Sequence, residues 1–129
     1  MSIKRYGAAG SGGIAGQRMP FAHAVQADGW LYVSSQVGMV NGEIVPGGIV
    51  EQSNRAIRNV LEIVENAGYD KADIVRCGIW LSDVRNWPSF NRVFAAHFDA
   101  ALPARTCIIA EMVVDCLVEI DCVAYRAMS

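Results

Sequence analysis

The sequence predicts one α+β domain in which two helices cover a single face of a β-sheet. Segments rich in β-branched and aromatic residues lie towards both ends of the chain, as strands require. Two segments between them repeat apolar residues at three- and four-residue steps, which is typical of amphipathic helices. The 129 residues suit one domain. We therefore expect a single domain over residues 1–129, with elements in the order β-β-β-α-β-α-β-β.

The first part of the chain contains the three expected amino-terminal strands. A stretch dominated by Gly, Ala and Ser makes residues 1–18 a loose segment in our prediction. A short strand is expected at His23–Val25 and a longer one at Trp30–Val40. The Asn-Gly pair that follows favours a two-residue hairpin, with Glu43–Val45 as the returning strand.

In the middle of the chain, the spacing of the apolar residues changes from that of strands to that of a helix. Residues 49–67 carry one apolar stripe at helical spacing, and Gly68 is placed to end that helix in a left-handed conformation. Ile74–Leu81 has the pattern of a buried strand. Asn86 is expected to cap a second helix that has Trp and Pro in its first turn.

The last third predicts two strands, Arg105–Met112 and Leu117–Tyr125. Two helices can cover only one face of the resulting sheet. Since these strands are apolar at most positions, we expect the uncovered face to pack against other copies of the chain.

Composition narrows the classes of function. Hydrophobic residues make up 53% and charged residues 19%, with a net charge of -2 and a pI of about 5.6. This balance, without a basic stripe, argues against nucleic acid as a partner. No apolar run is long enough for a membrane span, and the first residues lack a signal-peptide pattern, so we expect a cytoplasmic location. The four cysteines and two histidines do not cluster as zinc ligands do, and no metal site is expected.

Arg105 is the most unusual residue, because it opens an apolar strand directly after Pro103-Ala104. A guanidinium held at a stiff strand start could bind a carboxylate through two parallel hydrogen bonds. The alternative is a structural ion pair with Glu111, Glu119 or Asp121. The sequence leaves both interpretations open.

Glu119 and Cys107 are the other candidates for chemistry. Glu119 interrupts an apolar strand and could act as a general acid or base, or it could occupy an exposed strand position. Cys107 shares a face with Arg105 by the period of two. A nearby cation would lower the pKa of its thiol, yet a role in lining a pocket is favoured over a role as nucleophile.

Several segments, in their order, resemble the RidA family (YjgF/YER057c/UK114), the reactive-intermediate imine deaminases. They are Pro20–Val25, LYVSSQVG, NVLEIVENAG, WPSFNRVFAAHF, PARTC and VEIDCVA. The resemblance covers about Met19 to Arg126. It implies a chorismate-mutase-like fold and a homotrimer with sites in the clefts between subunits. It also implies hydrolysis of 2-imino or enamine acids to 2-keto acids and ammonia, without a metal or other cofactor.

The resemblance also implies roles for particular residues. The catalytic pair would be a carboxylate-binding arginine at Arg105 and a glutamate that handles water at Glu119. The remaining substrate-binding positions would fall on Cys107, Ser34, Asn91 and Phe21. Phe21 stands where the best-studied members have a tyrosine, so one hydroxyl is lost.

Three other functions compete with deamination of small imino acids. A non-enzymatic ligand-binding or regulatory trimer could use the same clefts. An RNA-directed activity is disfavoured by the acidic pI. A larger enamine could be the substrate if Phe21 makes the pocket more apolar.

Overall fold

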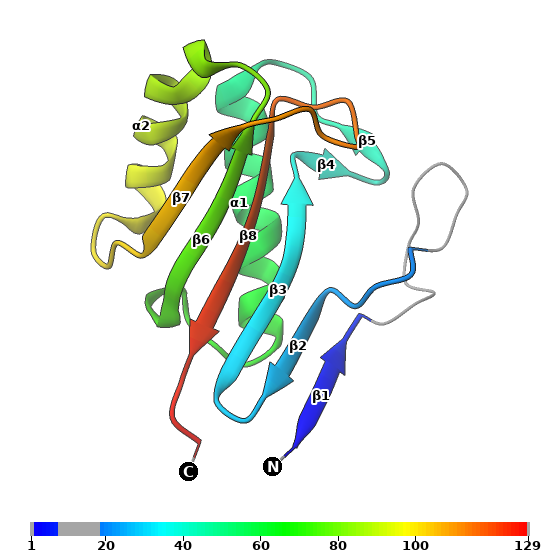
Figure 1. The fold of residues 1–129 in the computed structure, drawn as a ribbon, viewed down its shortest axis with the longest axis vertical. Coiled ribbons are helices and arrows are strands. Elements are labelled where there is room, and N and C mark those ends of the chain that lie inside the picture. Colours follow the sequence, from blue (N-terminus) through cyan, green and yellow to red (C-terminus); the bar gives the residue numbers. More distant parts are fainter. Residues whose placement is uncertain (1, 8–18, 129) are drawn as a thin grey trace.

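The computed structural model describes residues 2–7 and 19–128, and its main feature is a six-stranded sheet in the order β1-β2-β3-β8-β6-β7 (Figure 1). Neighbouring strands run antiparallel except β6 and β7, which are parallel. The strands of this sheet are β1 (Ile3–Tyr6), β2 (Ala24–Ala27), β3 (Trp30–Val37), β6 (Ile74–Leu81), β7 (Ala104–Ile109) and β8 (Val118–Tyr125).

Two helices, α1 (Ile49–Asn66) and α2 (Trp87–Phe98), lie on the same face of this sheet (Figure 1). Helix α1 packs on β3 and β8, and α2 packs beside α1. Their apolar stripes and the facing sheet positions form one continuous core. The expected α+β class, with both helices on one face, is confirmed. Gly68 has φ +88° after α1, as its position predicted.

The amino terminus differs from our expectation of a loose segment over residues 1–18. That expectation is wrong for residues 3–6, which form edge strand β1 and pair antiparallel with β2. The pairing partner lies about 20 residues away, so a four-residue local pattern could not reveal it. The Gly-rich part of the segment lies outside the described residues.

The strand expected at Trp30–Val40 is broken at Gly38. A Cβ atom at Gly38 would lie 2.6 Å from the Gln52 carbonyl oxygen, so the chain passes α1 at a distance that only glycine allows. Beyond the break, β4 (Met39–Val40) and β5 (Glu43–Ile44) form a separate two-stranded sheet. Both turn residues, Asn41 and Gly42, have positive φ, as the predicted Asn-Gly hairpin requires.

The start of α2 corrects a second expectation. Asn86 precedes the helix but makes no side-chain capping bond. The nearest side-chain cap belongs to a short 3₁₀ turn (Val84–Asn86), where Asp83 accepts a hydrogen bond from the Arg85 amide. Side-chain capping therefore acts one turn earlier than predicted. A second 3₁₀ turn (Lys71–Asp73) precedes β6.

The face of the sheet without helices is called the open face below. It carries large side chains that are between 42% and 50% exposed, namely Trp30, Tyr32, Ile108 and Tyr125. Trp30 and Tyr125 lie with their ring centroids 4.7 Å apart. Within the described part of the chain, no helix is long and apolar enough to cross a membrane.

Candidate active site

The guanidinium of Arg105 is held by two kinds of contact on the helix-covered face. Its central carbon lies 4.9 Å from the ring centroid of Phe94 and 5.5 Å from that of Phe90, both on α2. Its Nη2 also donates a hydrogen bond to Oδ1 of Asn91, from the same helix. The rings attract the cation and the amide fixes its plane. We call Arg105, Asn91 and Cys107 the anchor half-site.

Arg105 is half-buried and forms no ion pair with a carboxylate among the described residues. The structural alternative, an ion pair with Glu111, Glu119 or Asp121, is therefore wrong. Since Asn91 occupies one Nη2 hydrogen, other N–H groups of the guanidinium can still bind a carboxylate in the paired geometry that this side chain favours.

Cys107 follows Arg105 by two residues on β7 and packs against the core. Burial raises the pKa of its thiol, and the positive charge of Arg105 opposes this shift without cancelling it. The expected net fall of this pKa is therefore wrong, because burial outweighs the lowering by Arg105. A protonated thiol suits the lining of a pocket better than nucleophilic attack.

Glu119 lies on the central strand β8, and its carboxylate has a well-defined partner. The hydroxyl of Ser35 on β3 donates a hydrogen bond of 2.5 Å to Oε2 of Glu119. In the register of the sheet, the two residues that flank Glu119 are Val37 and Trp80, neither of them charged. We call Glu119 and Ser35 the carboxylate half-site.

A second carboxyl group, that of Asp121, lies on the same face of β8 as Glu119. Burial raises the pKa of Asp121, although the Gly78 amide donates a 2.9 Å hydrogen bond to it. A Cβ atom at Gly78 would lie 2.5 Å from the Asp121 carboxylate and 3.3 Å from the Trp80 ring. The missing side chain at Gly78 therefore lets both groups approach the strand closely.

The two half-sites lie on opposite faces of the sheet. Arg105 and Cys107 pair with Cys77 and Ile79, which are buried under the helices. Glu119 is flanked along β8 by buried residues and so points to the open face. One chain therefore does not bring the predicted catalytic residues together.

Ser34 precedes Ser35 of the carboxylate half-site, and its hydrogen bonds connect it to the segment that carries Phe21. The Ser34 hydroxyl donates 2.7 Å to the Ala22 carbonyl oxygen, and its amide donates 2.8 Å to the His23 carbonyl oxygen. These bonds tie the segment that carries Phe21 to β3. Phe21 is 46% exposed and lies just before β2, at the other side of the sheet from β7.

Sequence reasoning missed two features of this arrangement. Ser35 was not among the predicted site residues, although its hydroxyl binds Glu119. Nor were Phe90 and Phe94 predicted to support a guanidinium. Both features are contacts between distant segments, and no local pattern signals them.

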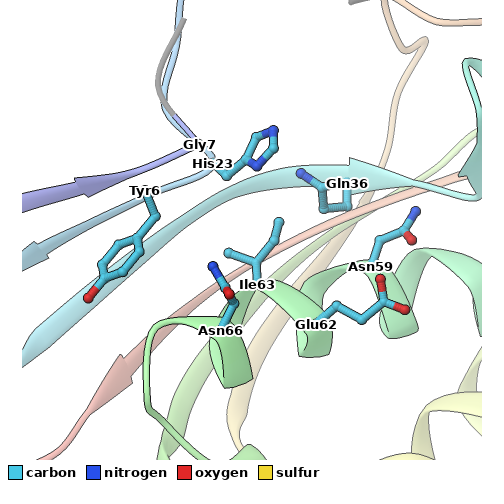
Figure 2. Close-up of a pocket in the computed structure, with 8 residues that line it drawn as sticks. All are labelled: Tyr6, Gly7, His23, Gln36, Asn59, Glu62, Ile63 and Asn66. Carbon is cyan, nitrogen blue, oxygen red and sulfur yellow. The ribbon is translucent and has the colours of Figure 1, made fainter. Parts of the chain in front are cut away.

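A separate hollow of about 570 Å³ lies between β1–β3 and α1 (Figure 2). Its most polar lining groups already have partners. The Asn59 amide donates to the carbonyl oxygens of Val37 and Met39, and Glu62 is paired with Arg55. The hollow contains no residue of either half-site. Over the described residues, no group of three or more His, Cys, Asp or Glu side chains is arranged to hold a metal ion.

Comparison with known proteins places this geometry in a family. The family model of Endoribonuclease L-PSP matches residues 15–126. A 2-iminobutanoate/2-iminopropanoate deaminase of Mus musculus is 35% identical over 110 residues, which are 83% of this chain and 82% of that protein. A RutC family protein of Pyrococcus horikoshii is 31% identical over 110 residues, which are 83% and 87% of the two chains.

Solved structures of related proteins have the same fold. The yeast protein YEO7 has a TM-score of 0.86 over 97% of this chain and 99% of its own, at 21% identity, which supports the fold alone. Escherichia coli TdcF, solved with bound serine, has a TM-score of 0.81 at 26% identity and covers 97% and 98% of the two chains. The fold is thus the chorismate-mutase-like fold of these proteins, and the chain belongs to the Endoribonuclease L-PSP family, the family of the RidA, YjgF and UK114 proteins.

Proposed function

We propose that the chain is a hydrolase that converts small 2-imino and enamine acids into 2-keto acids and ammonia. The observation that carries this proposal is Arg105, a half-buried guanidinium held by Asn91 and two aromatic rings with no carboxylate partner in the described chain. Relatives at this level of similarity are named 2-iminobutanoate/2-iminopropanoate deaminases. The serine bound to TdcF is itself a small molecule with a carboxylate.

In the proposed reaction, Arg105 binds the carboxylate of the substrate and so fixes the neighbouring C=N carbon. Glu119 takes a proton from water while the water oxygen bonds to that carbon. A proton then passes to nitrogen, the C–N bond breaks, and ammonia leaves as the C=O bond forms. The imine and one water are thereby converted into one keto acid and one ammonia, without a redox step or a cofactor.

The opposite placement of the half-sites leads us to propose that each site is shared between two copies. Arg105 would come from one copy and Glu119 from the next, within a homotrimer. The exposed aromatic and apolar side chains of the open face support self-association, because a monomer would leave them in water.

The reaction can be tested in an assay in which the imine is generated in the same mixture. An amino-acid oxidase generates the 2-imino acid, and semicarbazide traps whatever the protein has not hydrolysed. We expect less trapped imine with the wild-type chain and no effect with Arg105→Ala or Glu119→Gln. Arg85→Ala is the matched control, since this arginine is exposed and pairs with Asp83, which belongs to neither half-site. Ligand binding without turnover in the wild-type chain would instead support a non-enzymatic binding protein.

A mixing experiment tests the shared site. Arg105→Ala and Glu119→Gln chains are inactive alone, but a cyclic trimer formed from both places the intact residues together at some interfaces. Statistical mixing in equal amounts predicts recovery of about a quarter of the wild-type activity. A site built within one chain predicts no recovery at any ratio.

A further inference from the structure

We infer that Ser35 is the positioning residue of Glu119, an inference that rests on the proposed function. The Ser35 hydroxyl donates to Oε2 at 2.5 Å across 84 residues of sequence. Within residues 2–7 and 19–128, the Glu119 carboxylate accepts a side-chain hydrogen bond from this hydroxyl alone. Its occupation of Oε2 leaves Oε1 as the oxygen that receives the proton from water.

A shift in the pairing register between β3 and β8 places Ser35 next to Glu119. Val33 pairs with Cys122, whereas Gln36 pairs with Ile120, so β3 advances three residues while β8 advances two. Such a bulge adds a residue and redirects side chains. The two serines inside it take different partners, Ala22 for Ser34 and Glu119 for Ser35.

The surroundings of Glu119 offer no substitute for this bond. Val37 and Trp80 flank it in the ladder. The described ionisable groups whose pKa Glu119 raises are Asp121, on the same strand, and Cys116, just before β8, and neither an aspartate nor a cysteine can carry a positive charge. The nearby cation, Arg76, acts on Asp121. Loss of the Ser35 hydroxyl would leave a half-buried carboxylate free to change rotamer.

The test compares Ser35→Ala with Ser35→Thr, which keeps a hydroxyl at the same carbon. We expect Ser35→Ala to lower kcat about tenfold with KM changed less than about twofold, because substrate anchoring by Arg105 is untouched. Ser35→Thr should restore most of the wild-type kcat.

Ser53→Ala serves as the hydroxyl-deletion control. Ser53 lies buried on α1, and its hydroxyl has no hydrogen-bond partner in the described chain. We expect its kcat and KM to match those of the wild type. An unchanged kcat in Ser35→Ala would overturn the inference.

A measurement independent of turnover separates this inference from the proposed function. Carboxyl-carbon NMR of glutamate-labelled protein, recorded at one pH, compares the Glu119 resonance of the wild-type, Ser35→Ala and Ser35→Thr chains. A shift of this resonance in Ser35→Ala that Ser35→Thr reverses supports the role of Ser35 even if the wild-type chain hydrolyses no imine. An identical Glu119 resonance in the wild-type and Ser35→Ala chains refutes it even if the chain is an active deaminase.

Discussion

Arg105 and Glu119 lie on opposite faces of one sheet, on β7 and β8, with β6 between them. Each residue is well held where it is, Arg105 by Asn91 and Glu119 by Ser35. A local shift of side chains cannot carry either group through a hydrogen-bonded sheet. If both groups act on one substrate, as proposed, a second copy of the chain has to bring them together.

Replacement of Asn91 by Ala should weaken substrate binding more than it slows chemistry. Without the amide oxygen, Arg105 regains rotamer freedom that binding must then remove. We expect KM to rise about fivefold, with kcat within about twofold of the wild type. Steady-state kinetics measure both constants, and Asn66→Ala on the exposed end of α1 is the control. A fall in kcat alone would contradict a role in substrate anchoring.

Cys107 should not act as a nucleophile. Burial raises the pKa of its thiol and keeps it protonated near neutral pH. We expect Cys107→Ala to retain kcat within about threefold, because a pocket wall tolerates the loss of one sulfur. Alkylation by iodoacetamide near pH 7 should be slow for the same reason. Complete loss of turnover in Cys107→Ala, with Arg105 still binding carboxylates, would show that the thiol reacts covalently.

A charge at Tyr32 should break the assembly without unfolding the chain. Tyr32 lies on the open face and is 50% exposed in the single chain. A carboxylate there would be desolvated without a partner if the face packs against another copy. We expect Tyr32→Asp to elute as a monomer, to keep its circular dichroism spectrum and to lose turnover.

Val50→Asp is the control for this variant, because Val50 is exposed on α1, away from the open face. It should remain trimeric by light scattering. A trimer in both variants would show that the open face near Tyr32 is not an interface.

Stability should fall on mild acidification because of His97. Its Nε2 lies 2.9 Å from Asn54 Oδ1, and its pKa is lowered from 6.5 by burial first, and then by Lys71 and Arg58. The unfolded chain therefore binds this proton more readily than the folded chain does. The contribution of His97 to the free energy of unfolding is therefore greatest above about pH 6.5. It decreases as the pH falls towards the pKa that His97 has in the folded chain.

Urea denaturation at fixed protein concentration measures whether stability falls with pH in this direction. The wild-type midpoint should drop between about pH 7.5 and pH 5, and part of that drop should vanish in His97→Gln. An equal pH dependence in both chains would show that His97 does not contribute.

The local character of most elements could be predicted from the residues alone. Apolar spacing over residues 49–67 gave a helix one residue longer than α1, and Ile74–Leu81 is a strand with the predicted bounds. These predictions succeed because helices and strands have fixed periods that a short segment carries in full. β1 and the break at Gly38 were missed, since each depends on a partner far along the chain.

For the candidate site, the sequence by itself determined the residue types: an arginine after a proline turn, a lone glutamate in an apolar strand and a cysteine beside them. The tertiary structure alone decided which face each one occupies, that Arg105 rests on Phe90 and Phe94 rather than in an ion pair, and that Ser35 holds Glu119. The physical reason is that side-chain partners across a sheet are set by strand order and register. Both arise from burial summed over the whole core, and a one-residue bulge is enough to change them.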